Sequence, residues 1–376
     1  MLRRMHRSNN YWFLSFSVML SSICGCLGFV LPNNNELDQD LPRFGLGTAA
    51  LGRPGYINLD RDETVGTSNV RSVEYMRELT ESMMDYVFEL NKNGEMPLWF
   101  DCARSYGKSE EFVGDFLRKR GIKPKDVYVS SKWGYEYVAD WNVALADGEP
   151  HEVKDHSIGM FLKQVEETVA RLGEYVRLYQ IHSATFESGV LTNADVLDAL
   201  ARCRRERGWR IGLSVSGPNQ DAVIRAALAV ETADGARLFD SVQCTFNLLE
   251  QKAGPALLEA HRAGVDVIVK EGLANGRALR SLTLAAVCAR EPALRELGAG
   301  PDALALGAVL AQPFRPRVLS GAAARAQLAA NAKAQAVGAL LGEGGALGPA
   351  VLAELMEGCR VGSEEYWAER AALAWN

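Results

Sequence analysis

Four side chains of complementary chemistry follow short apolar runs in the first half of the chain. Asp101 ends the run "PLWFD", and Tyr106 follows five residues later. Lys132 ends "VYVSSK", and His182 ends "LYQIH". A phenol with a pKa near 10 exchanges protons poorly at neutral pH, but a neighbouring ammonium group favours its ionised form. With an acid to hold that ammonium and an imidazole to orient a substrate oxygen, the set predicts proton transfer to a carbonyl or from an alcohol.

Each of these residues alone has a structural explanation, because strand-end acids and single lysines are common in folded proteins. Their joint placement favours a shared site. The four side chains contain no redox centre, so a hydride would have to come from a bound cofactor. An alternative is a barrel aldolase in which Lys132 forms a Schiff base, but it leaves Asp101 and Tyr106 without a role.

Strand and helix patterns alternate along the chain that positions these residues. Apolar runs predict eight strands. The first begins at residue 43, and the others lie at 97–101, 126–132, 176–182, 210–217, 239–247, 265–272 and 317–323. Apolar residues at helical spacing predict helices over 72–94, 109–121, 157–173, 193–208, 218–230, 254–264, 301–313 and 325–340. Between the third strand and the third helix, residues 134–157 are expected to form a long loop.

Alternating strands and helices predict a parallel sheet with right-handed crossovers. Eight such units indicate an α/β fold, a closed (β/α)₈ TIM barrel whose active site lies where the strands end. An open doubly wound sheet is the alternative, but "GLGTAALG" after the first strand breaks the GxGxxG spacing typical of that fold. The barrel therefore predicts that all four chemical side chains meet at one rim.

Residues 1–40 differ from the rest of the chain. The basic segment "MLRRMHRSNN" precedes 21 residues without a charge, a pattern typical of a cleaved secretory signal or a membrane anchor. An alternative is a bipartite plastid-targeting signal, since "CLGFVLP" resembles its Phe-containing cleavage region. The segment predicts the secretory pathway, the endomembranes or a plastid; otherwise a cytoplasmic location is expected. The catalytic domain is expected at 41–340, with a helical tail at 341–376.

Composition narrows the classes of partner. The net charge is −6 and no long basic block occurs beyond the N-terminus, which argues against nucleic acid. Seven cysteines without CxxC spacing predict neither disulfides nor a zinc site. His151 and His156 lie five apart in a charged loop and are expected to be surface residues or helix-start groups, without a metal. A small-molecule partner remains, membrane contact is expected only through the N-terminal segment, and the sequence does not indicate the oligomeric state.

The motifs around the four residues resemble those of the aldo-keto reductase family. "FDCARSYGKSEEFVG" is similar to the family's Asp–Tyr signature, "VSSKWG" to the strand of its lysine and "LYQIH" to the strand of its histidine. The resemblance covers residues 42–335 and keeps the motif order. It implies that Tyr106 is the general acid/base, that Lys132 and Asp101 tune it, and that His182 orients the substrate.

The resemblance also implies a bound nicotinamide dinucleotide, NADP with NAD as the alternative. The family holds the nicotinamide carboxamide with a Ser–Asn pair and a Gln, for which this chain offers Ser214 and Gln243, with Val215 in the place of Asn. Lys270 and Glu271 occupy the region where many members stack an aromatic residue on the nicotinamide.

The segment "SGAAARAQLAANA" resembles the family's loop and helix for the adenosine phosphate. Its expected contacts are Ser320, Gly321, Gln327 and Asn331, and Arg325 is the arginine that would reach a 2′-phosphate. Trp133 and Tyr135, which follow the catalytic lysine, are expected to wall the substrate pocket or to pack at the rim.

These features together predict an NAD(P)-dependent oxidoreductase that interconverts a carbonyl (aldehyde, ketone or sugar) and an alcohol by hydride transfer. The "ARSYG" motif is similar to that of sugar and aldose dehydrogenases, so an oxidative galactose-type dehydrogenase is one alternative. A non-catalytic NAD(P)-binding regulatory protein on the same barrel is the other.

Overall fold

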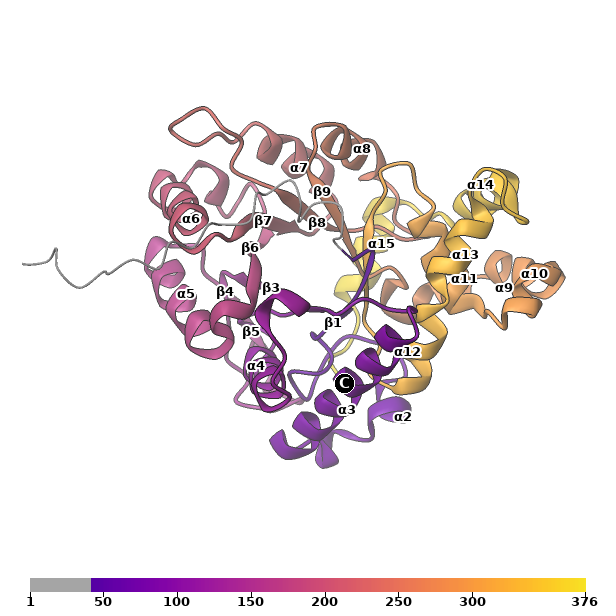
Figure 1. Cartoon of the computed structure of the whole chain (residues 1–376), viewed down its shortest axis with the longest axis horizontal. Coiled ribbons are helices and arrows are strands. Elements are labelled where there is room, and N and C mark those ends of the chain that lie inside the picture. Colours follow the sequence, from indigo (N-terminus) through magenta and orange to yellow (C-terminus); the bar gives the residue numbers. More distant parts are fainter. Residues whose placement is uncertain (1–41) are drawn as a thin grey trace, which may run out of the picture. The chain divides into compact units, whose positions relative to one another are not determined.

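Eight parallel strands close into a barrel in the computed structural model, which describes residues 42–376 (Figure 1). In the order in which they pair round the barrel, the strands are β1 (Phe44–Gly47), β10 (Arg317–Ser320), β9 (Asp266–Lys270), β8 (Ser241–Thr245), β7 (Arg210–Val215), β6 (Val176–Ala184), β3 (Tyr128–Trp133) and β2 (Trp99–Asp101). The predicted TIM barrel is confirmed, and the open doubly wound sheet is wrong. The predicted targeting segment lies outside the described residues.

Strand register places three of the four predicted catalytic residues on one face. Asp101 of β2 is level with Ser130 of β3, two residues before Lys132. Lys132 is in turn level with Gln180 of β6, two residues before His182. Because side chains alternate with a period of two, each step of two residues returns to the same face, and the tilt of barrel strands accounts for the stagger.

Helices surround the strands as an outer ring (Figure 1). The predicted ones are α3 (Val73–Lys92), α4 (Ser109–Lys119), α5 (Ile158–Leu172), α6 (Ala194–Arg207), α7 (Gln220–Leu228), α8 (Gly254–Arg262) and α11 (Pro301–Leu310), with the last prediction divided into α12 (Arg325–Ala332) and α13 (Ala334–Leu341). Helix α5 shows why they form: Ser157 caps its first turn by accepting from the Met160 N–H, and Phe161 and Val165 face the core.

The barrel interior is filled below the rim. Trp99, Leu178, Ile268 and Leu319, from four different strands, form a buried cluster across it. The Trp99 indole N–H donates to the Ser130 hydroxyl at 3.1 Å, which satisfies its only polar atom. The interior is therefore a packed core, and ligands have access only at its ends.

Several elements were not predicted from the sequence. Residues 134–157 contain an antiparallel pair, β4 (Tyr135–Tyr137) and β5 (Glu152–Lys154), where a loop was expected. Short helices that sequence periodicity does not resolve are α2 (Arg61–Val65), α9 (Leu282–Arg290), α10 (Pro292–Leu297) and the 3₁₀ turns η1 (Ser68–Val70), η2 (Pro124–Asp126), η3 (Gly173–Tyr175), η4 (Val190–Thr192) and η5 (Ala274–Arg280). Their few residues carry too little pattern to distinguish helix from loop.

The predicted helical tail comprises α14 (Gly348–Cys359) and α15 (Ser363–Ala371). Helices α9, α10 and α14 lie together on one side of the barrel (Figure 1), where a second buried cluster includes Leu284, Leu294 and Leu355. Within residues 42–376, no helix combines the length and apolarity needed to cross a membrane.

Candidate active site

Asp101 and Lys132 form a buried ion pair at the rim of the barrel. The Lys132 ammonium, which is fully buried, donates to an oxygen of the Asp101 carboxylate and to the Cys102 carbonyl at 3.0 Å. Its third contact is the Tyr106 hydroxyl at 3.4 Å. These contacts engage all three N–H groups of the ammonium. The aldolase alternative needs an amine with a free lone pair, so this arrangement argues against it.

Close packing of two loops fixes the position of Tyr106. A Cβ atom on Gly52, in the loop after β1, would lie 2.2 Å from the Tyr106 carbonyl oxygen. The next residue, Gly107, has a positive φ of 59°, and a Cβ there would lie 2.5 Å from the Gly52 carbonyl. The Lys108 N–H donates to that same carbonyl at 2.7 Å. Both glycines are needed because any side chain would separate the loops.

Burial raises the pKa of Tyr106 well above its usual value, and the Asp101 carboxylate adds to this rise. The lowering expected from Lys132 is outweighed, because burial and the Asp101 carboxylate, which pairs with the Lys132 ammonium, both favour the neutral phenol. Tyr106 is therefore a protonated hydroxyl at neutral pH.

His182 lies against the same phenol. The Tyr106 and His182 rings meet edge to face with centroids 5.5 Å apart. The Nδ1 atom of His182 is 3.3 Å from the Ser105 hydroxyl. Burial, followed by the nearby charge of Lys132, lowers the pKa of His182 well below its usual value. The imidazole is thus neutral at physiological pH and can act as a hydrogen-bonding group toward a substrate oxygen.

His156 was expected at the surface or at the start of a helix, and it is buried directly before Ser157, the N-cap of α5. It is 7% exposed, its Nε2 donates to the His182 carbonyl at 2.9 Å, and burial lowers its pKa to about 4. Trp133 is fully buried between His156 and Phe161, so it belongs to the core and not to a pocket wall. Tyr135 is partly exposed, and its ring lies 5.0 Å from that of His182.

The sequence reasoning missed Arg53 in the loop after β1. This buried guanidinium lies 5.2 Å from the centre of the Tyr106 ring. It donates to the Ser105 carbonyl at 2.9 Å and pairs with Glu152 of β5 at 2.8 Å. On another side it lies 4.6 Å from the ring of Trp375, near the end of the chain. The sequence feature that could have pointed to Arg53 is that it is the single arginine within the glycine-rich segment "GLGTAALGRPG".

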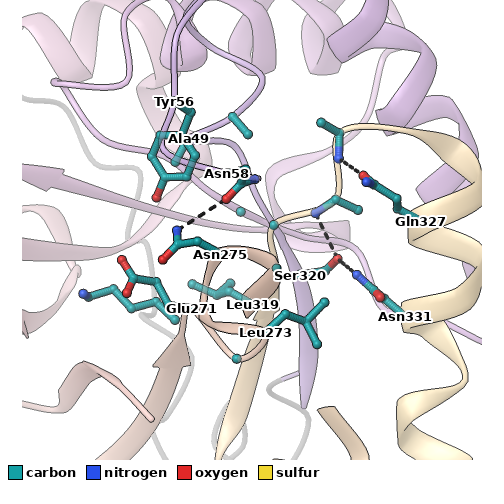
Figure 2. A pocket seen from close by; sticks show the side chains of 18 of the residues that line it. Ala49, Tyr56, Asn58, Glu271, Leu273, Asn275, Leu319, Ser320, Gln327 and Asn331 are labelled. Atoms are coloured by element: carbon teal, nitrogen blue, oxygen red, sulfur yellow. Dashed lines mark hydrogen bonds between the residues drawn. The ribbon is translucent and has the colours of Figure 1, made fainter. Parts of the chain in front are cut away.

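A cavity of about 280 Å³ opens beside Tyr106. Six of the eight predicted cofactor-binding residues line it: Gln243, Lys270, Ser320, Gly321, Gln327 and Asn331. Asp101 and Tyr106 also line it. Figure 2 shows Glu271 on one side of the cavity and Gln327 and Asn331 on the other. The Asn331 amide donates to the Ser320 hydroxyl at 2.9 Å, and the Gln327 side chain accepts from the Ala323 N–H at 3.0 Å.

Two of the predicted cofactor contacts lie elsewhere. The Ser214 hydroxyl accepts the Ser183 N–H at 2.8 Å and does not line the cavity. Arg325 also lies outside the cavity lining, because its Nε donates to Ser82 on α3 at 3.1 Å. The side chain therefore packs on a neighbouring helix in this structure, which its position in the sequence could not reveal.

The polar groups in the cavity wall suit a dinucleotide. Arg61, which the sequence reasoning also missed, is buried in the cavity wall. It bonds only to backbone carbonyls, those of Ala50, Arg53 and Pro54, and its Nη1 has no partner among the described residues. Such a cation suits a phosphate. The buried Gln243 Oε1 also lacks a partner among residues 42–376 and suits a carboxamide N–H.

Lys270 and Glu271 follow one another where β9 ends. The Lys270 ammonium donates to the hydroxyls of Ser216 and Thr245, each at 3.0 Å, and burial lowers its pKa to about 8. Burial by itself would raise the pKa of Glu271, but the charges of Arg370 and Lys270 outweigh it and lower that pKa to about 2. The Thr245 hydroxyl joins the two residues, since it accepts from Lys270 and donates to Glu271 at 3.3 Å.

Comparison with known proteins gives one family and a common fold. The model of the Aldo/keto reductase family matches residues 64–340. No curated protein matches the chain significantly. A proposed aldo-keto reductase from Pseudomonas aeruginosa is 23% identical with a TM-score of 0.54, covering 78% of this chain and 91% of that one. An aldo-keto reductase from Bacillus halodurans, in its holo form, is 21% identical with a TM-score of 0.55, covering 84% and 91%.

Proposed function

The chain belongs to the aldo/keto reductase family, and we propose that it is an NAD(P)-dependent oxidoreductase that reduces the carbonyl group of a small molecule to an alcohol. One observation carries this proposal. A protonated phenol, Tyr106, borders the cavity with the Lys132 ammonium 3.4 Å from its oxygen and the His182 ring against its face. A proton donor that is held between a cation and a neutral imidazole suits the protonation of a carbonyl oxygen.

In this mechanism Tyr106 transfers its hydroxyl proton to the substrate oxygen. The Lys132 ammonium stabilises the phenolate that remains, and Asp101 holds the ammonium in place. His182, kept neutral by burial, donates a hydrogen bond that orients the substrate oxygen. When bound, the nicotinamide dinucleotide supplies the hydride for the carbonyl carbon.

The residues proposed to hold the dinucleotide come from separate parts of the cavity wall. Gln243 would accept from the carboxamide, and Arg61 would face the phosphates. Ser320, Gln327 and Asn331 would contact the adenosine end. We propose NADP as the cofactor on the basis of the family resemblance alone. Arg325, the residue expected at the 2′-phosphate, contacts Ser82 and gives this proposal no support. Parallel titrations with NADPH and NADH test this preference.

The raised pKa of Tyr106 bears on the oxidative alternative. Oxidising an alcohol requires a base, and a phenol that is protonated at neutral pH must first lose its proton to act as one. A galactose-type dehydrogenase on this site would therefore work best at alkaline pH.

The test is a Tyr106→Phe variant assayed with a panel of aldehydes, ketones and sugars in both directions. We expect nucleotide binding to persist, because the ring is retained, and turnover to fall by about 10²–10⁴-fold. Tyr86→Phe, on the outer helix α3, is the matched control and should keep wild-type turnover. A Tyr106→Phe variant with the wild-type rate would refute the assignment. Nucleotide binding without turnover in the wild type would instead support the regulatory alternative.

A further inference from the structure

Lys270 places a positive charge in the wall of the cavity that also contains Tyr106 and Gln243. Both of its hydrogen-bond partners, Ser216 and Thr245, are neutral hydroxyls. Among the described residues it makes no ion pair with a carboxylate. Hydroxyl groups solvate an ammonium but do not cancel its charge, so this charge acts on whatever occupies the cavity.

The carboxylates nearest to Lys270 are engaged by other cations. Glu271, the next residue, has both oxygens bound by Arg370 of α15, with the closest contact at 2.5 Å. Asp101 is bound by Lys132 of β3. Each of these two pairs is close to neutral as a unit, and although Glu271 attracts Lys270, its carboxylate is hydrogen-bonded to Arg370 and not to Lys270.

The remaining titratable groups around Lys270 are uncharged at neutral pH. On β8, burial raises the pKa of the Cys244 thiol to about 12. On β6, burial and nearby cations lower the pKa of His182 well below its usual value. The pKa of Tyr106 is raised well above its usual value, mainly by burial. The net charge of this part of the cavity is therefore positive, and it comes from Lys270.

A nicotinamide ring differs in charge between its two redox states, since the oxidised ring is a cation and the reduced ring is neutral. Hydride transfer to a carbonyl protonated by Tyr106 requires that ring at the Tyr106 end of the cavity, and Lys270 is close enough to lower the pKa of His182, whose ring lies against Tyr106. A second cation there is repelled by an ammonium in a poorly solvated site, whereas a neutral ring is not. An aromatic side chain, which many family members have in this region, would instead attract the cationic ring.

We propose that Lys270 makes this site bind the reduced nicotinamide dinucleotide more tightly than the oxidised one and so favours carbonyl reduction. The inference rests on the proposed function, because it requires that the nicotinamide occupies this cavity. It assigns to Lys270 an electrostatic role in choosing the redox state of the cofactor, separate from proton transfer by Tyr106.

Titration of Lys270 gives the preference a pH dependence. With a pKa lowered to about 8, Lys270 is charged below this pH and neutral above it. The ratio of the dissociation constant of the oxidised form to that of the reduced form is thus highest below about pH 8 and decreases above it. The 2′-phosphate and pyrophosphate are common to both forms, so their titration cancels in this ratio.

The experiment measures that ratio on the full chain, with NADPH titrated by fluorescence and NADP⁺ by competition, from about pH 6.5 to about pH 9.5. We expect the wild-type ratio to fall with pH. Lys270→Met should lower the ratio about tenfold at neutral pH, a difference of about 1.4 kcal/mol. Lys270→Arg should keep a high ratio and lose its pH dependence, because arginine stays charged. Lys252→Met, which removes an exposed lysine, is the matched control and should behave as the wild type.

Two results would overturn the inference: a wild-type ratio that does not change with pH, or an unchanged ratio in Lys270→Met. If Lys270→Met does not fold, the wild-type pH series and Lys270→Arg decide the question. Failure of the wild type to bind either nucleotide would count against the proposed function itself. Binding of both forms with a constant ratio would count against the role of Lys270 alone.

Discussion

Arg370, on helix α15, binds both carboxylate oxygens of Glu271 at the end of barrel strand β9. Its Nε lies 3.0 and 2.9 Å from the two oxygens. The Asn247 amide strengthens the junction by donating to the Glu271 carbonyl at 2.9 Å and to the Tyr366 hydroxyl at 3.0 Å. The helical tail is thus attached to the cavity wall through a buried carboxylate, and its attachment determines the charge next to Lys270.

Replacing Arg370 with Met should destabilise the protein by about 3–5 kcal/mol, because it removes the cation that is hydrogen-bonded to the buried Glu271 carboxylate. The Glu271 side chain is only 6% exposed. Urea unfolding at neutral pH measures the loss. Arg360→Met, on an exposed arginine of the tail, is the control and should change stability by less than about 0.5 kcal/mol. Equal stability of Arg370→Met and the wild type would contradict this role of the ion pair.

The Arg370–Glu271 ion pair also predicts how the free energy of unfolding depends on pH. The pKa of Glu271 is lowered to about 2 in the folded protein, whereas an unfolded chain has a glutamate pKa of about 4.3. Ionised Glu271 therefore makes its full contribution to the free energy of unfolding above the pKa of the unfolded chain. This contribution is lost as the pH falls toward the pKa of the folded protein. In Arg370→Met this part of the acid sensitivity should shrink, and unfolding curves at neutral pH and near pH 4 would show whether it does.

Replacing Trp375 with Ala should weaken substrate binding more than the chemical step. The indole packs 4.6 Å from the Arg53 guanidinium and stacks on His151 at 4.1 Å, and Arg53 in turn lies over the Tyr106 ring. Without the indole, Arg53 becomes more solvated and less fixed. We expect a several-fold increase in KM, a smaller change in kcat, and a stability loss of about 1–2 kcal/mol.

Trp375→Phe tests whether the ring itself is what matters, since it keeps an aromatic face toward Arg53. It should recover most of the KM and of the stability. Steady-state kinetics with one carbonyl substrate and thermal unfolding suffice for this comparison. If Trp375→Ala left both KM and stability at wild-type values, the tail would have no part in holding Arg53.

The rate of carbonyl reduction, measured as kcat/KM at saturating cofactor, should be flat between about pH 5 and about pH 7.5. Histidine ordinarily titrates near 6.5. Here burial lowers the pKa of His156 to about 4 and that of His182 well below its usual value, so both rings stay neutral over this range. Tyr106 stays protonated because its pKa is raised. An acid limb near pH 6.5 would show that a histidine of the site titrates normally.

Much of the site was predictable because it follows from local pattern and barrel geometry. Asp101, Lys132 and His182 each end an apolar run, and parallel strands that close into a barrel bring their ends to one rim. No further information is needed to infer that these three side chains meet. The expected cofactor loop around Ser320 and Asn331 came from the family resemblance instead, and both residues line the cavity.

Other parts of the site depend on contacts that the sequence does not encode locally. His156 is buried under His182 because the β4–β5 hairpin folds back on the rim. Arg325 packs on α3 because two helices far apart in the chain are neighbours in the ring. A residue in a charged loop or on a helix face looks exposed until its neighbours are known.

The sequence by itself determined the barrel, because it follows from periodicity, and it predicted the proton-transfer residues from motifs at strand ends. Only the tertiary structure decided the electrostatics of these residues. Asp101 pairs with Lys132 and raises the pKa of Tyr106, and Arg370 binds the Glu271 carboxylate next to Lys270. A pKa depends on burial and on the distances between charges, and both arise only when distant segments pack together.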